Sequence, residues 1–192
     1  MYIHPSNIWA LFLCLKAPQL IALIVCRYPW LGVTRGEIIT ALCNLMHPIL
    51  YKEHSVIYTK ANIFEAITKE RFIDHSAAIA SLFLDRFNPR KPFTDFHFDE
   101  RVNVLRENIQ AEVEDSLAVS CLLKMIDIVK HTLKTNVYLP NRYAVSMRLD
   151  PTIMPTDKGK ESPFGVFFVH GRRFNAFRKL QDSGASLVIV VF

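Results

Sequence analysis

The sequence predicts an α+β fold, in which a helical region over residues 1–134 precedes a β-rich region over residues 135–192. Two changes of pattern support this division. Apolar residues recur every three or four positions up to about residue 133, which indicates amphipathic helices. From about residue 143 the apolar period falls to two, which is typical of half-buried strands. The chain is 51% hydrophobic and 21% charged, which is a composition of globular proteins.

The first apolar stretch, residues 7–26, is interrupted near its centre by Lys16 and Pro18. A membrane-spanning helix needs about 20 consecutive apolar residues. The stretch also lacks the basic start and small-residue cleavage site of a secretory signal. We therefore expect two short buried elements, separated next to Pro18. A signal anchor or a membrane-associated helical protein is the alternative, and release of the protein by carbonate extraction would count against it.

The next helix is expected to begin at a capping box made by Thr34 and Glu37. In such a box the threonine hydroxyl accepts from an amide of the first turn, and the glutamate reaches back to the cap. Pro48 is expected to end or kink the helix at about His47. The apolar stripe of this helix comprises Ile38, Ala41, Leu42 and Leu45.

Further helical patterns follow. Their apolar faces are, in order, Ile63, Ala66 and Ile67 with Glu70 near the end; Ile79, Leu82 and Phe83 from about Ser76; Val102, Leu105, Ile109 and Val113; and Leu122, Ile126, Val129 and Leu133. Asn88 and Pro89 are expected to stop the second of these helices. Asp115 with Ser116 is expected to cap the last one.

The strands are expected after residue 142. Tyr143, Val145, Met147 and Leu149 alternate with small or polar residues, and Asp150 with Pro151 closes this strand. Residues 156–162 are a polar loop, residues 164–169 an apolar strand, residues 170–172 a turn and residues 174–180 a returning strand. Residues 186–192 are uncharged and β-prone, so an unpaired edge there would favour aggregation. We therefore expect the chain to end within a domain.

Charge and cysteine content bound the possible functions. The net charge is only +5, and acidic residues are interspersed among basic ones, so a nucleic-acid partner is not expected. The four cysteines, Cys14, Cys26, Cys43 and Cys121, form no CxxC motif. Reduced intracellular thiols are favoured over a disulfide or zinc framework.

No motif identifies a catalytic, cofactor-binding or metal-binding residue, so none is assigned. No two of the six glycines are separated by a single residue, so GxGxxG and GxxxxGK[ST], the usual cradles for phosphates, are missing. The histidines lack the spacing of metal ligands, and the serines lack a GxSxG elbow. His97, between Asp95 and Asp99, is expected to be a loop or helix-entry residue.

The best candidate for an anion site is the basic group Arg172, Arg173, Arg178 and Lys179. At a hairpin turn such side chains are usually solvated. An anionic substrate, a nucleotide phosphate or an acidic partner group is the alternative. Arg148 lies opposite the apolar stripe of its strand, where it is either a buried ion-pair partner or exposed.

Several blocks of sequence resemble, in order, the large NAD-specific glutamate dehydrogenases. They are residues 82–89 (LFLDRFNP), 133–138 (LKTNVY), 144–151 (AVSMRLDP) and 164–178 (FGVFFVHGRRFNAFR). The resemblance covers about residues 78–180, whereas residues 1–77 add only a compatible helical pattern. It implies that residues 135–192 are the first strands of a truncated α/β substrate domain.

The family oxidises glutamate to 2-oxoglutarate and ammonia with NAD, which requires a lysine and an acid–base carboxylate. In the family these groups follow the hairpin and are approached by a DIARGG-like turn. Here residues 182–186 read DSGAS, so only Asp182 matches and no catalytic residue is carried over. The resemblance therefore implies a fragment that ends before the catalytic and nucleotide-binding regions, without an NAD site of its own and inactive as an isolated chain.

Two explanations of this departure stay open: a truncated or mis-translated product whose reading frame changes near Leu180, or a short paralogue with a structural role. The alternative function is a structural module that docks on a full-length dehydrogenase subunit, so other dehydrogenase subunits are the expected partners. A mitochondrial or cytoplasmic location fits the family.

Overall fold

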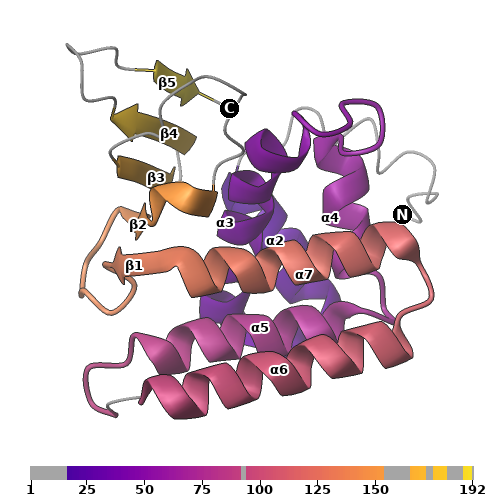
Figure 1. Cartoon of the computed structure of the whole chain (residues 1–192). Helices are drawn as coiled ribbons and strands as arrows, with labels where there is room; N and C mark the ends of the chain where they lie inside the picture. The colour runs from indigo at the N-terminus through magenta and orange to yellow at the C-terminus, as the bar shows by residue number, and fades with distance from the viewer. Residues whose placement is uncertain (1–16, 92–93, 154–164, 172–174, 181–187, 192) are drawn as a thin grey trace.

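The computed structural model describes residues 17–91, 94–153, 165–171, 175–180 and 188–191, in which helices precede a sheet (Figure 1). The α-helices are α2 (Ala17–Arg27), α3 (Gly32–Leu50), α4 (Lys60–Thr68), α5 (Ile73–Arg86), α6 (Asp95–Glu112) and α7 (Ser116–His131). The strands are β1 (Thr132–Thr135), β2 (Ala144–Leu149), β3 (Gly165–Gly171), β4 (Asn175–Leu180) and β5 (Val188–Val191), with 3₁₀ turns η2 (Pro29–Leu31) and η3 (Pro151–Ile153). The predicted α+β class is confirmed.

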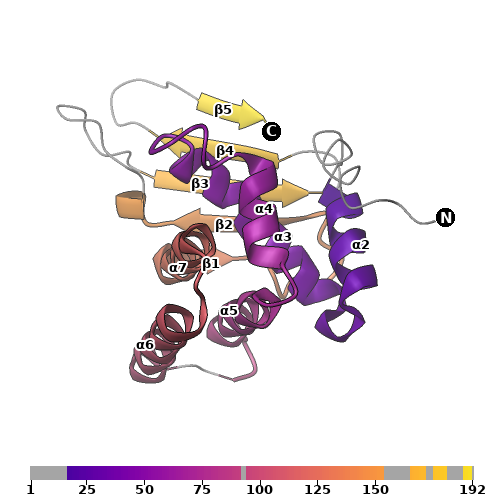
Figure 2. The ribbon, with the colours of Figure 1, turned by 90° about the vertical axis from the view of Figure 1, so that its right-hand side faces the viewer.

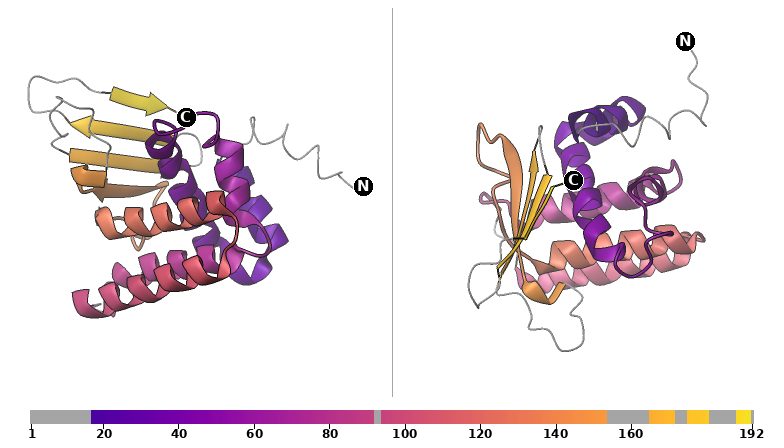
Figure 3. Two further views of the ribbon diagram at one scale, coloured as in Figure 1. Left: turned by 45° about the vertical axis from the view of Figure 1, so that its right-hand side comes forward. Right: turned by 90° about the horizontal axis from the view of Figure 1, so that it is seen from above.

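The strands form one antiparallel sheet in the order β1-β2-β3-β4-β5. Figure 3 shows this sheet nearly edge-on, with the helices gathered mainly on one side of it. Alternate residues of a strand face opposite sides. The inward residues of β2 and β3 are accordingly buried: Val145, Met147, Leu149, Val166, Phe168 and His170.

Helix α3 lies in the middle of the helical layer and contacts α2, α4, α5 and α7 (Figure 2). The predicted stripe of this helix is confirmed, because Ile38, Ala41, Leu42 and Leu45 are all fully buried. Gly36 allows α2 to approach closely: a Cβ there would lie 3.0 Å from the Val25 Cγ2 atom. The core of the described chain is therefore built around α3.

The predicted boundaries of α3 are wrong at both ends. The helix begins at Gly32, directly after η2, and Leu31 before it already has helical angles of −64° and −37°. Thr34 therefore lies inside the helix and caps nothing, and Glu37 pairs with Arg142 instead. Pro48 lies in the last turn and removes one i→i−4 hydrogen bond there, but the helix continues to Leu50.

The later helices follow the predicted apolar faces, with shifted ends. Glu70 lies beyond α4 and is exposed, and α5 begins at Ile73 rather than at about Ser76. The cap at Asp115 is confirmed, since its carboxylate accepts from the Leu117 and Ala118 amides at 3.0 and 3.2 Å. Leu133 is not on the face of α7, because that helix ends at His131 and Leu133 lies in β1.

The strand predictions hold in β2 and β3, with two corrections. Tyr143 precedes β2 and is almost fully exposed. His170 and Gly171 do not form a turn, because they pair with Val145 and Ala144 and so extend β3.

The C-terminal strands follow the predicted order. The returning strand is confirmed as β4. Strand β5 pairs with β4 on one side and forms an edge of the sheet, in line with the edge expected for residues 186–192. The polar loop at residues 156–162 lies outside the described residues, and the division of the chain at residue 134 stays a prediction.

Helix α2 corresponds to the second of the two short apolar elements predicted before residue 27. The first, residues 7–15, falls outside the described part of the chain. No helix among the described residues is long and apolar enough to cross a membrane.

Candidate functional site

A cleft of about 830 Å³ lies between α2, the start of α3 and the segment that leads into β2. Its volume falls in the range of small-molecule and peptide sites. The residues that line it are Ile21, Ala22, Val25, Cys26, Val33, Thr34, Glu37, Leu84, Val137, Tyr138, Arg142, Tyr143 and His170. Most of these side chains are apolar, and the polar ones come from elements far apart in the sequence.

The charged residues of the cleft are Glu37 and Arg142, which form an ion pair across 105 positions of sequence. Both side chains are largely buried. The Arg142 Nε atom is also buried, and it makes no hydrogen bond with any residue that the structure describes. The pair is therefore close to neutral overall, and one buried donor of the guanidinium is left without an acceptor among the described residues.

Asn136 shapes the segment that carries Arg142. Its side-chain Nδ2 donates to the Ala144 carbonyl at 3.0 Å, and its Oδ1 accepts from the Ser146 amide at 2.7 Å. Its carbonyl accepts from the Leu139 amide at 2.9 Å, which makes a turn. Asn141 has a φ of +58°, a conformation that asparagine tolerates better than most residues. These local bonds place Arg142 beside Glu37.

Two further polar side chains border the cleft. The Tyr138 hydroxyl donates to the Leu84 carbonyl at 2.9 Å, and burial, with the nearby Asp85, raises the pKa of this phenol. His170 is buried on β3, with its ring stacked on that of Phe168 at 6.3 Å between centroids. The sequence placed His170 in a turn, so its position in this cleft was missed.

The cleft lining is mostly apolar, which suits the binding of a ligand. Its lining contains one carboxylate, which is held in the ion pair, and no lysine. A general acid or base must be within reach of a substrate proton and able to exchange its own. A largely apolar molecule matches the lining more closely.

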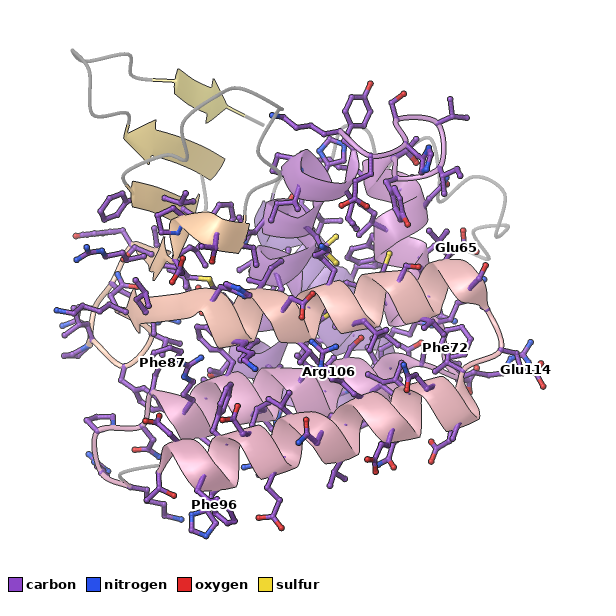
Figure 4. The ribbon with its side chains drawn as sticks, viewed as in Figure 1. Glu65, Phe72, Phe87, Phe96, Arg106 and Glu114 are labelled. Carbon is purple, nitrogen blue, oxygen red and sulfur yellow. The ribbon has the colours of Figure 1, made fainter. Side chains whose placement is uncertain are left out.

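A second depression, of about 630 Å³, lies where α4 meets α5 and α6 meets α7. Lys69 lies 3.2 Å from the Asp115 carboxylate, and His75 lies 3.4 Å from that of Glu112. Figure 4 shows Phe72 and Glu114 at this end of the helices. The first contact joins the end of α4 to the start of α7, and the second joins α5 to α6.

Four titratable side chains lie between α3, α4 and α7. Burial raises the pKa of Cys43 and of Cys121 to about 12, and it lowers the pKa of His47 and of Lys60. Burial therefore favours the neutral form of each. In the described part of the chain, no three His, Cys, Asp or Glu side chains are placed to hold a metal ion.

Of the residues singled out from the sequence, His97 and Arg148 do not line the cleft. His97 lies in the first turn of α6, as expected, with its ring against the Thr94 hydroxyl. Arg148 is exposed, with its guanidinium 6.0 Å from the Phe167 ring. Arg172 and Arg173 lie outside the described residues, so the anion site stays a prediction.

Besides the position of His170, the sequence missed the pairing of Glu37 with Arg142 and the role of Arg86. The Arg86 guanidinium donates to the Val129 and Lys130 carbonyls at 2.5 and 3.0 Å, which satisfies the end of α7. It also stacks 4.3 Å from the Phe98 ring centre. From the sequence, the only indication of a role for Arg86 was its position in the block at residues 82–89. Its contacts are made with residues far away in the chain, which a local pattern does not reveal.

Comparison with known proteins gives two partial similarities. The chain is 34% identical over 70 residues to glutamate dehydrogenase 2 of Dictyostelium discoideum, which covers 36% of this chain and 7% of that protein. It is 32% identical over 100 residues to the NAD-specific glutamate dehydrogenase of Saccharomyces cerevisiae, which covers 50% of this chain and 8% of that protein. No family model and no solved structure matches. The resemblance is thus confirmed as a relation to a small part of these enzymes.

Proposed function

We propose that this chain is a non-catalytic fragment related to NAD-specific glutamate dehydrogenase, and that on its own it does not oxidise glutamate. The observation that carries the proposal is the cleft lining, which offers no lysine and no unpaired carboxylate for the reaction. The similarity to only 8% of the yeast enzyme supports it.

The test is an assay of NADH formation by the purified chain with L-glutamate and NAD. The expected rate equals that of a heat-denatured sample, and the full-length yeast enzyme serves as the positive control. Glutamate-dependent NADH formation above the denatured sample would overturn the proposal.

A second function is favoured by the exposed edge of the sheet: a structural module that docks on a full-length dehydrogenase subunit. Strand β1 is one edge of the sheet, and its Leu133 side chain is 47% exposed. An edge strand presents unpaired backbone groups to which another chain can add. Arg148 and Phe167 lie on the outward face of the neighbouring strands, next to this edge.

Co-expression with a tagged full-length NAD-specific glutamate dehydrogenase tests this docking. The chain should co-purify, and Leu133→Lys should reduce its recovery severalfold. Val104→Lys on α6 is the matched control, because that valine is similarly exposed, at 49%, but lies away from the sheet. Failure of the unmodified chain to co-purify would exclude the module.

A further inference from the structure

The described strands of the sheet contain basic residues but no acidic one. The charged residues are Lys134 in β1, Arg148 in β2, and Arg178 with Lys179 in β4. Strands β3 and β5 contain neither aspartate nor glutamate. Figure 3 shows the helices gathered mainly on one side of the sheet, which leaves its outward face free of any described helix. The sheet itself therefore supplies no counter-charge to these cations.

Three of the cations occupy one row that crosses the sheet. Lys134 is the register partner of Arg148, and Arg148 is the register partner of Phe167. Phe167 is in turn the register partner of Arg178. Neighbouring strands lie about 4.8 Å apart, so the row is roughly 14 Å long. We call these four residues the basic row.

The basic row lies on the outward face. Met147 and Phe168 are buried on the inward face, and Arg148 and Phe167 alternate with them along β2 and β3. Lys134 and Arg148 are exposed, and Phe167 is half-buried. Neither Lys134 nor Arg148 forms an ion pair with any residue that the structure describes. Both cations are thus available to a partner.

This arrangement is unfavourable without an anion. Like charges directly opposite each other on neighbouring strands are destabilising, and Lys134 and Arg148 are such a pair. The Arg148 guanidinium carbon lies 6.0 Å from the centre of the Phe167 ring. A guanidinium beside an aromatic ring still has N–H groups with which it can bind a carboxylate or phosphate through two hydrogen bonds. The basic row is therefore suited to an anionic partner.

The composition of the face favours an acidic protein segment over a nucleic acid. Single-stranded nucleic acids stack successive bases on several aromatic side chains, whereas the basic row has one, Phe167. Val169, at the next outward position of β3, is half-buried and adds an apolar contact beside the charges. Arginine and aromatic side chains next to apolar ones are typical of the centre of protein interfaces.

The length of the row sets the size of the partner segment. Roughly five residues of extended chain span 14 Å. We propose that the basic row binds an acidic, extended segment of a protein partner, whose carboxylates pair with Lys134 and Arg148.

Fluorescence anisotropy of a short labelled oligoglutamate peptide, titrated with the purified chain at low ionic strength, tests this proposal. The peptide should bind, and added salt should weaken the complex because salt screens exposed charges. Arg148→Glu should weaken binding by about fivefold, the upper range for an exposed ion pair. Lys134→Glu, on the neighbouring strand, should have a similar effect. Arg148→Lys keeps the charge and should retain most of the binding.

Arg71→Glu is the matched control, because it makes the same change in net charge at another exposed arginine. Arg71 lies between α4 and α5 and lines the second depression, which no strand residue lines. Figure 4 shows its neighbour Phe72 at the end of the helices away from the sheet. Circular dichroism would verify that every variant is folded.

The outcomes separate the possible partners. Loss of peptide binding in Arg148→Glu and Lys134→Glu, but not in Arg71→Glu, supports the proposal. An equal loss in Arg71→Glu would show attraction by net charge alone and overturn it, as would a parent chain that does not bind the peptide. Tighter binding of single-stranded oligothymidylate of the same length, lost in Arg148→Glu, would assign the basic row to a nucleic acid and also overturn it. None of these results depends on whether a dehydrogenase subunit co-purifies with the chain.

Discussion

At the residue scale, the cysteines differ sharply in environment. Cys43 and Cys121 are buried, and desolvation raises the pKa of each thiol to about 12, whereas Cys26 is exposed. Since the thiolate is the reactive form, the two buried residues should be inert in the folded chain.

Alkylation with iodoacetamide in a Cys14→Ser background should therefore modify Cys26 well before Cys43 and Cys121, which should react only after unfolding in urea. Peptide mass spectrometry after timed quenching measures the three rates. Equal rates for all three thiols in the folded chain would contradict the buried placement of Cys43 and Cys121.

Gly32 is required for the backbone conformation that it adopts before α3. Its angles, φ 70° and ψ 163°, lie in a region that essentially only glycine occupies, and no other group lies within 4 Å of its missing Cβ. Strain, and not crowding, is therefore what a side chain would cause there.

Gly32→Ala should lower the free energy of unfolding by about 1–3 kcal/mol, the usual cost of such backbone strain. Urea denaturation measures it. Asn141→Gly is the control, because the φ of +58° at Asn141 suits glycine and the change should be near neutral. An unchanged midpoint for Gly32→Ala would show that the turn before α3 relaxes without cost.

At the scale of elements, side-chain caps mark the starts of three helices. Thr59, Thr94 and Asp115 accept from amides in the first turns of α4, α6 and α7. Burial alone would raise the pKa of Asp115, but the Ala118 and Leu117 amides and Lys69 together lower it. The charged form of this cap is therefore favoured by folding.

Asp115→Ala should cost about 1 kcal/mol at neutral pH, the typical value of a lost N-cap. Because the folded pKa lies below the unfolded value of about 4, the charge contributes stability above that pH and loses it as the pH falls through the folded pKa. Asp115→Asn, which keeps the cap without the charge, should lose less stability than Asp115→Ala at pH about 7 and show a shallower loss in acid. Urea titrations across this pH range measure both effects, and identical acid slopes for Asp115→Asn and the parent chain would contradict them.

The apolar faces of the elements were predictable because helix and strand periods are local properties of the sequence. Ile63, Ile79 and Leu122 are buried where the helical period places them, and Val145 and Met147 where the strand period places them. Boundaries were less predictable. The start of α3 depends on η2 before it, and the length of β3 depends on pairing of His170 with Val145, neither of which a periodic pattern contains.

At the scale of the whole molecule, the sheet and the helices share buried residues. Phe168 on β3 is fully buried on the inward face, and α3 contacts the same strand. Helical and β-rich regions that share a core should unfold in one transition.

Phe168→Ala should therefore lower the free energy of unfolding by about 3–5 kcal/mol, from lost burial and a cavity. Phe167→Ala, on the outward face of the same strand, is the matched control and should cost clearly less. Circular dichroism and tryptophan emission should report one common transition. Helices that persist after the sheet has unfolded would instead support separate domains divided at residue 134.

The candidate cleft could not have been predicted from local patterns. Glu37 and Arg142 are 105 positions apart, and the sequence favoured a capping role for Glu37. From the sequence, Arg86 was notable only because it belongs to the block at residues 82–89. Its hydrogen bonds to the carbonyls of Val129 and Lys130 depend on how α5 packs on α7.

Periodicity in the chain was enough to predict the α+β class, the order of the elements and their buried faces, and the resemblance of short sequence blocks indicated the partial relation to glutamate dehydrogenases. These properties follow from neighbouring residues, whose spacing sets which side chains share a face. Only the tertiary structure determines that Glu37 pairs with Arg142, that His170 lies in the cleft and that this cleft opens beside α2. Those contacts join residues far apart in the chain, so they exist only once the helices and the sheet have come together.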